Sequence, residues 1–142
     1  MKLTELTFVV QGPVVWKDNR NLTAECLKSI RNFYPGSKII LSTDCGMMTD
    51  NLDFDLVVLN NFNEPILIDN DRVGTIFSTN LQISSSITGL RKVDTPFVVR
   101  IRSDMIVNSN NLVTLLETRP KRKRLPRLTL TDDLVIVLNW ST

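Results

Sequence analysis

The stretch FVVRIRSD, residues 97–104, decides the fold predicted for this chain. It begins as an apolar run typical of a buried strand, and Pro96 stands at its entrance, where the missing backbone N–H does least harm. Arg102, Ser103 and Asp104 then interrupt the run. Charged and hydroxyl side chains directly after a buried strand are typical of a parallel sheet whose strand ends face a ligand.

Apolar runs and helical periodicities alternate on both sides of this stretch. The periodicities predict four strands at residues 6–12, 37–46, 52–60 and 95–104 and three helices at residues 19–36, 72–93 and 108–118. Buried strands that alternate with crossover helices indicate an α/β fold with a mostly parallel sheet and flanking helices.

Two of the predicted helices carry distinctive local signals. The first has Asn19 or Asn21 as a possible N-cap, and Pro35-Gly36 ends it. The second has an apolar stripe, interrupted by serines, that predicts a buried helix face; its members are Val73, Ile76, Phe77, Ile83, Ile87 and Leu90.

Composition narrows the classes of function. The chain has 142 residues, a net charge of +2, two cysteines and no histidine. The absence of histidine excludes His-based acid–base catalysis and most zinc sites, and two cysteines are too few for a disulfide framework. The small net charge does not indicate a nucleic-acid partner. No apolar run is long enough for a membrane span or a signal peptide, so we expect a cytoplasmic protein with at most peripheral membrane contact.

The predicted strands and helices form one domain at residues 1–118, and a basic tail follows at 119–142. The tail contains the cluster KRKR, residues 121–124, which is more typical of a solvated segment than of a nucleic-acid site. An apolar run at 134–138 has the composition of one added edge strand.

Polar side chains follow three of the predicted strands. Gln11 ends the first, Asp44 ends the second, and Arg102 with Asp104 ends the fourth. Because the carboxyl ends of parallel strands meet at one edge of a sheet, we expect these side chains to share a ligand site.

Each of these residues has a functional and a structural interpretation. Asp104 either binds a divalent cation such as Mg²⁺ or Mn²⁺ or caps the next turn. Arg102, two residues away and on the same side of an extended chain, either contacts phosphate or packs its stem and reaches solvent.

The remaining candidate residues also have both a functional and a structural interpretation. Asp44 either accepts a hydrogen bond from a ribose or stabilises its own loop, and Gln11 either contacts a nucleotide or supports the Gly-Pro turn. Asn80 falls on the apolar stripe, where its amide needs a ligand or a backbone carbonyl as partner. The common dinucleotide and P-loop fingerprints are both absent from the sequence.

Several segments together resemble a bacterial family, the WavE-type lipopolysaccharide-synthesis proteins, which are regarded as similar to glycosyltransferases of the GT-A fold. The segments are TFVVQGPV, CLKSIRNFYPGSKIILST and NLQISSSITGLRKVDTPFVVRIRSD, which match the family in order and spacing over about residues 5–110. This resemblance implies a Rossmann-like, nucleotide-binding half of a GT-A domain.

The resemblance also implies roles for individual residues. In GT-A enzymes a short acidic DxD motif after a strand holds the divalent metal at the sugar nucleotide's diphosphate. RSD stands in that place here, which implies Asp104 as the metal ligand, with Arg102 in place of the first acid. Gln11 and Asp44 would then lie near the nucleotide. Asn80 and Gln82 match two positions of the family's N-R-Q motif, whose arginine is Leu81 here.

The activity implied is glycosyl transfer from a nucleotide-sugar donor to a glycan or lipid-linked acceptor, in lipopolysaccharide or surface-polysaccharide synthesis, with Mn²⁺ or Mg²⁺ as cofactor. No residue stands out as the catalytic base. Because the resemblance fades after about residue 118, the alternative is an inactive, truncated nucleotide-binding remnant of such an enzyme. The sugar, the nucleotide and the linkage are not encoded in any motif.

Overall fold

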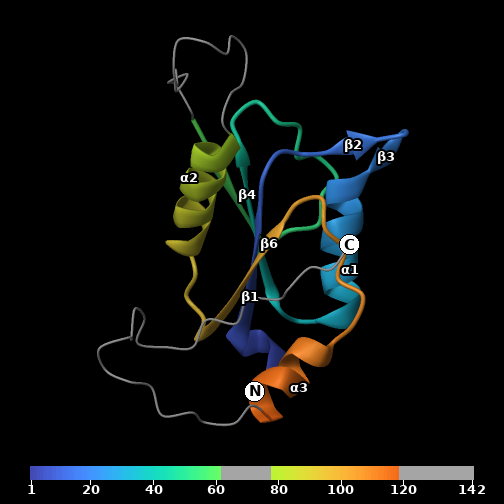
Figure 1. The fold of residues 1–142 in the computed structure, drawn as a ribbon, viewed down its shortest axis with the longest axis vertical. Helices are drawn as coiled ribbons and strands as arrows, with labels where there is room; N and C mark the ends of the chain where they lie inside the picture. Colours follow the sequence, from blue (N-terminus) through green and yellow to red (C-terminus); the bar gives the residue numbers. More distant parts are fainter. Residues whose placement is uncertain (62–77, 119–142) are drawn as a thin grey trace.

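The computed structural model describes residues 1–61 and 78–118 of the chain. Four strands and two helices make up its centre, with a small hairpin at one end and short helices at the other (Figure 1). In chain order the elements are η1 Leu3–Glu5, β1 Leu6–Gln11, β2 Trp16–Lys17, β3 Arg20–Asn21, α1 Leu22–Phe33, β4 Lys38–Asp44, β5 Leu56–Asn60, α2 Ser78–Leu90, β6 Phe97–Arg102 and α3 Asn111–Thr118.

The main sheet is parallel throughout and has the strand order β5-β4-β1-β6. Counted along the chain these are its third, second, first and fourth strands, which is the order of a Rossmann-like half. The predicted α/β fold with a parallel sheet and flanking helices is therefore confirmed. The order reverses between β1 and β6, and at their carboxyl ends Gln11 lies opposite Arg102.

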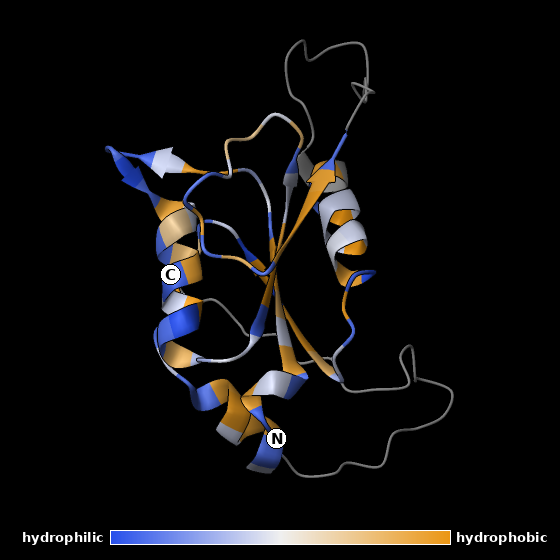
Figure 2. Ribbon diagram, turned by 180° about the vertical axis from the view of Figure 1, so that it is seen from behind, coloured by the Kyte–Doolittle hydropathy of each residue, from blue (hydrophilic) through white to orange (hydrophobic). Residues whose placement is uncertain are grey.

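Helix α1 covers one face of the sheet and α2 covers the other (Figure 1). The apolar core lies on the α1 face, and Figure 2 shows long hydrophobic stretches in orange along the strands. Alternate residues of each strand point to this side because side chains alternate across a strand. The buried members of the core are Leu6, Phe8, Val10, Cys26, Leu27, Ile30, Tyr34, Ile39 and Leu41.

The local signals for α1 are confirmed in part. Asn21 is the N-cap, and its side chain accepts a hydrogen bond from the backbone N–H of Ala24 at 3.0 Å. The helix starts later than expected, because residues 16–21 form a tight hairpin instead. Asp18 and Asn19 adopt positive φ angles of 49° and 61° at its turn, which both residue types tolerate.

Helix α2 is oriented opposite to the sequence prediction. Its serine-rich side packs on the sheet, with Ser85 and Ser86 buried, while Ile83 and Ile87 are 52% and 44% exposed. The prediction that the apolar stripe forms the buried face is therefore wrong for the described part of the helix. The part of the stripe at Val73, Ile76 and Phe77 lies outside the described residues.

Close packing between α2 and the sheet explains this orientation. A Cβ atom on Gly89 would lie 2.6 Å from Val9 Cγ1 and 3.0 Å from Ser42 Cβ, so only glycine allows the approach. At this distance the small hydroxyl side chains of the helix fit against the strands, whereas isoleucine side chains would not.

The remaining predictions have mixed outcomes. The third strand is shorter than expected, since it begins at Leu56 rather than at residue 52. Helix α3 forms as predicted, and Glu117 on it accepts a hydrogen bond of 2.8 Å from the N-terminal amine of Met1. The prediction for the tail at 119–142 lies outside the described residues, and the domain boundary at residue 118 stays a prediction.

Candidate functional site

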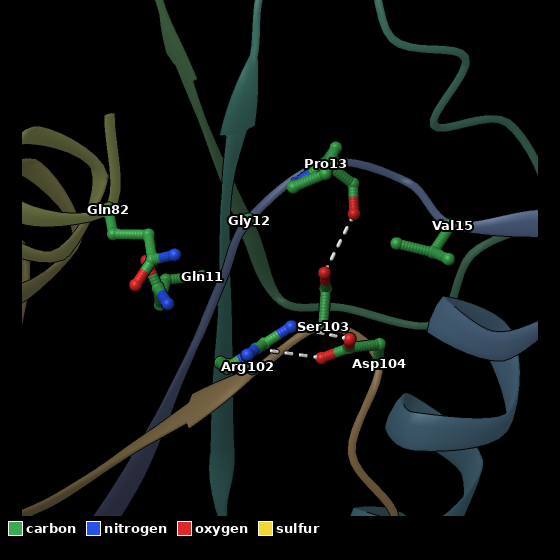
Figure 3. Close-up of a pocket in the computed structure, with 8 residues that line it drawn as sticks. All are labelled: Gln11, Gly12, Pro13, Val15, Gln82, Arg102, Ser103 and Asp104. Carbon is green, nitrogen blue, oxygen red and sulfur yellow. Dashed lines mark hydrogen bonds and ion pairs between the residues drawn. The ribbon is translucent and has the colours of Figure 1, made fainter. Parts of the chain in front are cut away.

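A pocket of about 80 Å³ lies at the carboxyl ends of β1 and β6, where the strand order reverses (Figure 3). In open α/β sheets this crevice is where ligands bind. The pocket is smaller than the roughly 300–1,000 Å³ typical of complete ligand sites, so it has room for only one part of a large ligand. It is lined by Gln11, Gly12, Pro13, Val15, Gln82, Arg102, Ser103 and Asp104.

The loop after β1 is fixed in place by backbone geometry. Gly12 has a φ of 123°, which strongly favours glycine, and a Cβ there would lie 2.9 Å from Ser103 Oγ. Ser103 Oγ in turn donates to the carbonyl of Pro13 at 2.7 Å, as Figure 3 shows. The backbone N–H of Ser103 also donates to the Gln11 carbonyl at 2.9 Å. The two strand ends therefore form one rigid wall.

Gln11 is 1% exposed, and its side chain is held by α2. Its Oε1 accepts a hydrogen bond from Ser85 Oγ on α2 at 2.9 Å, and Ser86 Oγ lies 3.4 Å away. Its Nε2 donates to no described residue. Gln11 also lines the pocket, and an amide N–H is a hydrogen-bond donor.

Arg102 and Asp104 form a bidentate ion pair across the pocket (Figure 3). Arg102 Nε donates to Asp104 Oδ1 at 3.0 Å, and Nη2 donates to Oδ2 at 2.7 Å. Their side chains are 51% and 30% exposed, so the pair is solvated and contributes only about 0–1 kcal/mol to the free energy of folding. A pair this weak is readily rearranged by a ligand.

The prediction that Asp104 binds Mg²⁺ or Mn²⁺ stays a prediction, but the surrounding side chains do not fit a metal site as they stand. Both carboxylate oxygens already accept hydrogen bonds from Arg102. The described residues contain no cluster of three or more histidine, cysteine, aspartate or glutamate side chains that could hold a metal ion. A cation would have to displace the guanidinium group and would gain a single carboxylate.

A second arginine flanks the pocket. Arg100 precedes Arg102 by two residues on β6, so both side chains leave the same face of the strand. Arg100 Nε donates to Ser86 Oγ at 2.8 Å, and Ser86 lies within reach of Gln11. No carboxylate of the described residues pairs with Arg100. At the end of β6, two guanidinium groups therefore accompany one carboxylate, although Arg100 does not itself line the pocket.

Cys26 lies behind this site on α1, where its thiol contacts the Arg102 carbonyl at 3.7 Å. Burial raises the pKa of Cys26 to about 12, and the negative charge of Asp104 adds to the shift. A thiol with this pKa stays protonated near neutral pH, so it is a packing group and not a nucleophile.

Of the residues singled out from the sequence, Gln11, Gln82, Arg102 and Asp104 line one pocket. Asp44 does not line it, because β4 is the neighbour of β1 on the side away from β6. Burial raises the pKa of the Asp44 carboxyl. Asn80 falls within α2, but its side chain lies outside the described ones.

Sequence reasoning missed Ser85, Ser86 and Arg100. A signal for each was present. The serines follow Gln82 by three and four residues, which places them on the same helix face, and Arg100 alternates with Arg102 along a strand.

The fold and this pocket define a Rossmann-like α/β protein with a polar pocket at its topological switch point. Comparison with protein families adds one match, to the WavE lipopolysaccharide synthesis family, over residues 6–141. The chain belongs to this family. The match covers nearly the whole chain and extends past residue 118, near which the resemblance seen in the sequence fades.

No curated protein and no solved structure matches the chain. None of the helices in residues 1–61 and 78–118 is long and apolar enough to cross a membrane. Membership of the family assigns the chain to lipopolysaccharide synthesis. The pocket between β1 and β6 is the candidate functional site.

Proposed function

We propose that the chain is the nucleotide-binding part of a cytoplasmic GT-A-like glycosyltransferase in lipopolysaccharide or surface-polysaccharide synthesis. The donor is a nucleotide sugar and the acceptor a glycan or a lipid-linked sugar. The observation that carries the proposal is the pocket between β1 and β6, which combines a switch-point position with amide, guanidinium and carboxylate side chains.

The pocket suits the charged middle of such a donor better than its base or its sugar. Its small volume fits one part of the ligand, and its side chains are those that bind phosphate oxygens. In glycosyl transfer the diphosphate leaves with increasing negative charge. Hydrogen-bond donors already oriented toward it stabilise that charge without reorganisation at the moment of reaction.

Side chains of this chain would then have separate tasks. Arg102 contacts the diphosphate, and Gln11 donates from its amide Nε2 to an oxygen of the donor. Gln82 lines the pocket from α2, so it contacts the same ligand from the helix side. Asp44 remains a proposed contact for the ribose or base, outside the pocket itself.

The test is calorimetric titration of the full chain with UDP, GDP, ADP and CDP and with their common nucleotide sugars, once with Mn²⁺ and once with EDTA. We expect one nucleotide class to bind in at least one condition. Gln11→Ala should weaken that binding by about tenfold or more, the loss expected for a ligand hydrogen bond and its orientation.

Asn32→Ala is the matched control, because Asn32 is an exposed amide near the C-terminal end of α1, remote from the pocket. It should leave binding unchanged. If no nucleotide binds in either condition to a protein that circular dichroism shows to be folded, the proposal fails and an inactive remnant becomes the better account.

A further inference from the structure

We propose that the pocket binds the donor's diphosphate directly through Arg100 and Arg102, without a divalent cation, and that Asp104 is the counter-ion which Arg102 exchanges for the ligand. This inference rests on the proposed function, since it specifies how the same pocket recognises its ligand.

The first argument is that the guanidinium group of Arg102 is exposed and already bound to a carboxylate. Its guanidinium group is 51% exposed and makes two parallel hydrogen bonds to a carboxylate, through Nε and Nη2. A phosphate presents the same pair of acceptor oxygens to this edge of an arginine. Exposed ion pairs are weak, so a doubly charged diphosphate can replace the Asp104 carboxylate at little cost.

The second argument is the second arginine on the same face of β6. Arg100 uses Nε for Ser86 Oγ, and its two Nη groups donate to no described residue. The Cα atoms of Arg100 and Arg102 are about 6.6 Å apart along an extended strand, within the reach of two long side chains onto neighbouring phosphates. Ser86 holds Arg100 at Nε, which leaves the end of the guanidinium group for a ligand.

The third argument concerns a cation in the same place. Among the described residues that line the pocket, Asp104 alone has a carboxylate, and Arg102 occupies both of its oxygens. A divalent cation would replace a guanidinium group there and would still be repelled by the charge of Arg100 on the same strand. Direct recognition by arginine needs no such displacement.

The experiment compares binding of inorganic pyrophosphate and of the nucleoside diphosphates in EDTA and in Mn²⁺. We expect the affinity in EDTA to lie within about threefold of that in Mn²⁺. Arg102→Gln should weaken binding by about tenfold or more, and Arg100→Gln by about three- to tenfold. Arg102→Lys should bind more tightly than Arg102→Gln and less tightly than the natural chain, because lysine keeps the charge and loses the bidentate geometry.

Arg91→Gln is the matched control for the loss of one positive charge. Arg91 is exposed just after α2, near the amino ends of the strands and away from the pocket, so binding should be unchanged. Circular dichroism and thermal melting of each variant separate a lost contact from a lost fold.

The variant Asp104→Asn distinguishes a counter-ion of Arg102 from a metal ligand, because the two roles predict opposite changes in binding affinity. If Asp104 is a counter-ion, this variant keeps the affinity in EDTA or increases it, because Arg102 is no longer neutralised. Binding that appears only with Mn²⁺ and disappears in Asp104→Asn would overturn the inference and keep the proposed function. An absence of binding in both conditions would overturn both.

Discussion

The two faces of the sheet are built in different ways. On the α1 side, Phe8, Leu27 and Ile30 are fully or almost fully buried, and the contacts are between apolar side chains. On the α2 side, Gln11, Ser42 and Ser85 are as deeply buried, and the contacts are hydrogen bonds. Strand β1 contributes to both sets, with Phe8 on one side and Gln11 on the other, because alternate residues point to opposite faces.

The hydrogen bonds under α2 form a connected set. Ser42 Oγ donates to the Ser85 carbonyl at 2.7 Å and accepts from Asn60 Nδ2 at 3.0 Å. Thr88 Oγ1 donates to the Asn60 side chain, and Ser85 Oγ donates to Gln11. Such a network specifies the position of the helix closely, since each buried polar group needs its partner. The α1 face therefore supplies stability, and the α2 face places the side chains of the pocket.

The largest expected effect tests the apolar side. Phe8→Ala should lower the free energy of unfolding by about 3–5 kcal/mol, because it leaves a cavity beside Tyr34, whose ring centroid lies 5.0 Å from that of Phe8. Urea denaturation followed by circular dichroism measures this change.

Val98→Ala is the control on the same sheet, since Val98 is 45% exposed on β6. It should change the free energy of unfolding by less than about 1 kcal/mol. Equal losses in the two variants would show that the α1 face does not dominate stability.

A smaller effect tests the close approach of α2. Gly89→Ala should lower the free energy of unfolding by about 1–3 kcal/mol, because the new methyl group would overlap Val9 Cγ1. The overlap outweighs the gain of roughly 1 kcal/mol that alanine has over glycine in a helix. Thermal melting with urea titration measures the difference.

Ser84→Ala provides the comparison within the same helix. Ser84 lies at an intermediate depth, and its hydroxyl makes no hydrogen bond to a described residue, so this variant should be neutral or slightly more stable. A Gly89→Ala protein as stable as the natural chain would mean that α2 can move outward freely.

The sequence predicts the apolar side of this comparison well. Strand runs such as residues 6–12 and 37–46 are long, apolar and bounded by turn residues, and the cap at Asn21 is a local hydrogen bond. Signals of this kind depend on neighbouring residues only. The prediction that Gln11, Arg102 and Asp104 come together also succeeds, because strand ends of a parallel sheet must meet at one edge.

The polar side could not be predicted in the same way. The stripe at Ile83, Ile87 and Leu90 has the right spacing for a buried face, yet partners distant in sequence, Gln11 and Ser42, bind the serines instead. The exclusion of Asp44 from the pocket follows from strand order, which periodicity does not encode.

The smallest expected effect tests the polar contact that joins α2 to the pocket. Ser85→Ala should lower the free energy of unfolding by about 1 kcal/mol, because Gln11 Oε1 loses its donor at 2.9 Å and Ser86 Oγ, at 3.4 Å, replaces it only in part. Combining Ser85→Ala with Gln11→Met removes both partners. The double variant should then lose less than the sum of the two single losses, with a coupling of about 0.5 kcal/mol or more in a double-mutant cycle measured by urea denaturation. Strictly additive losses would mean that the hydroxyl and the amide do not depend on one another, and the α2 face would then position Gln11 by shape alone.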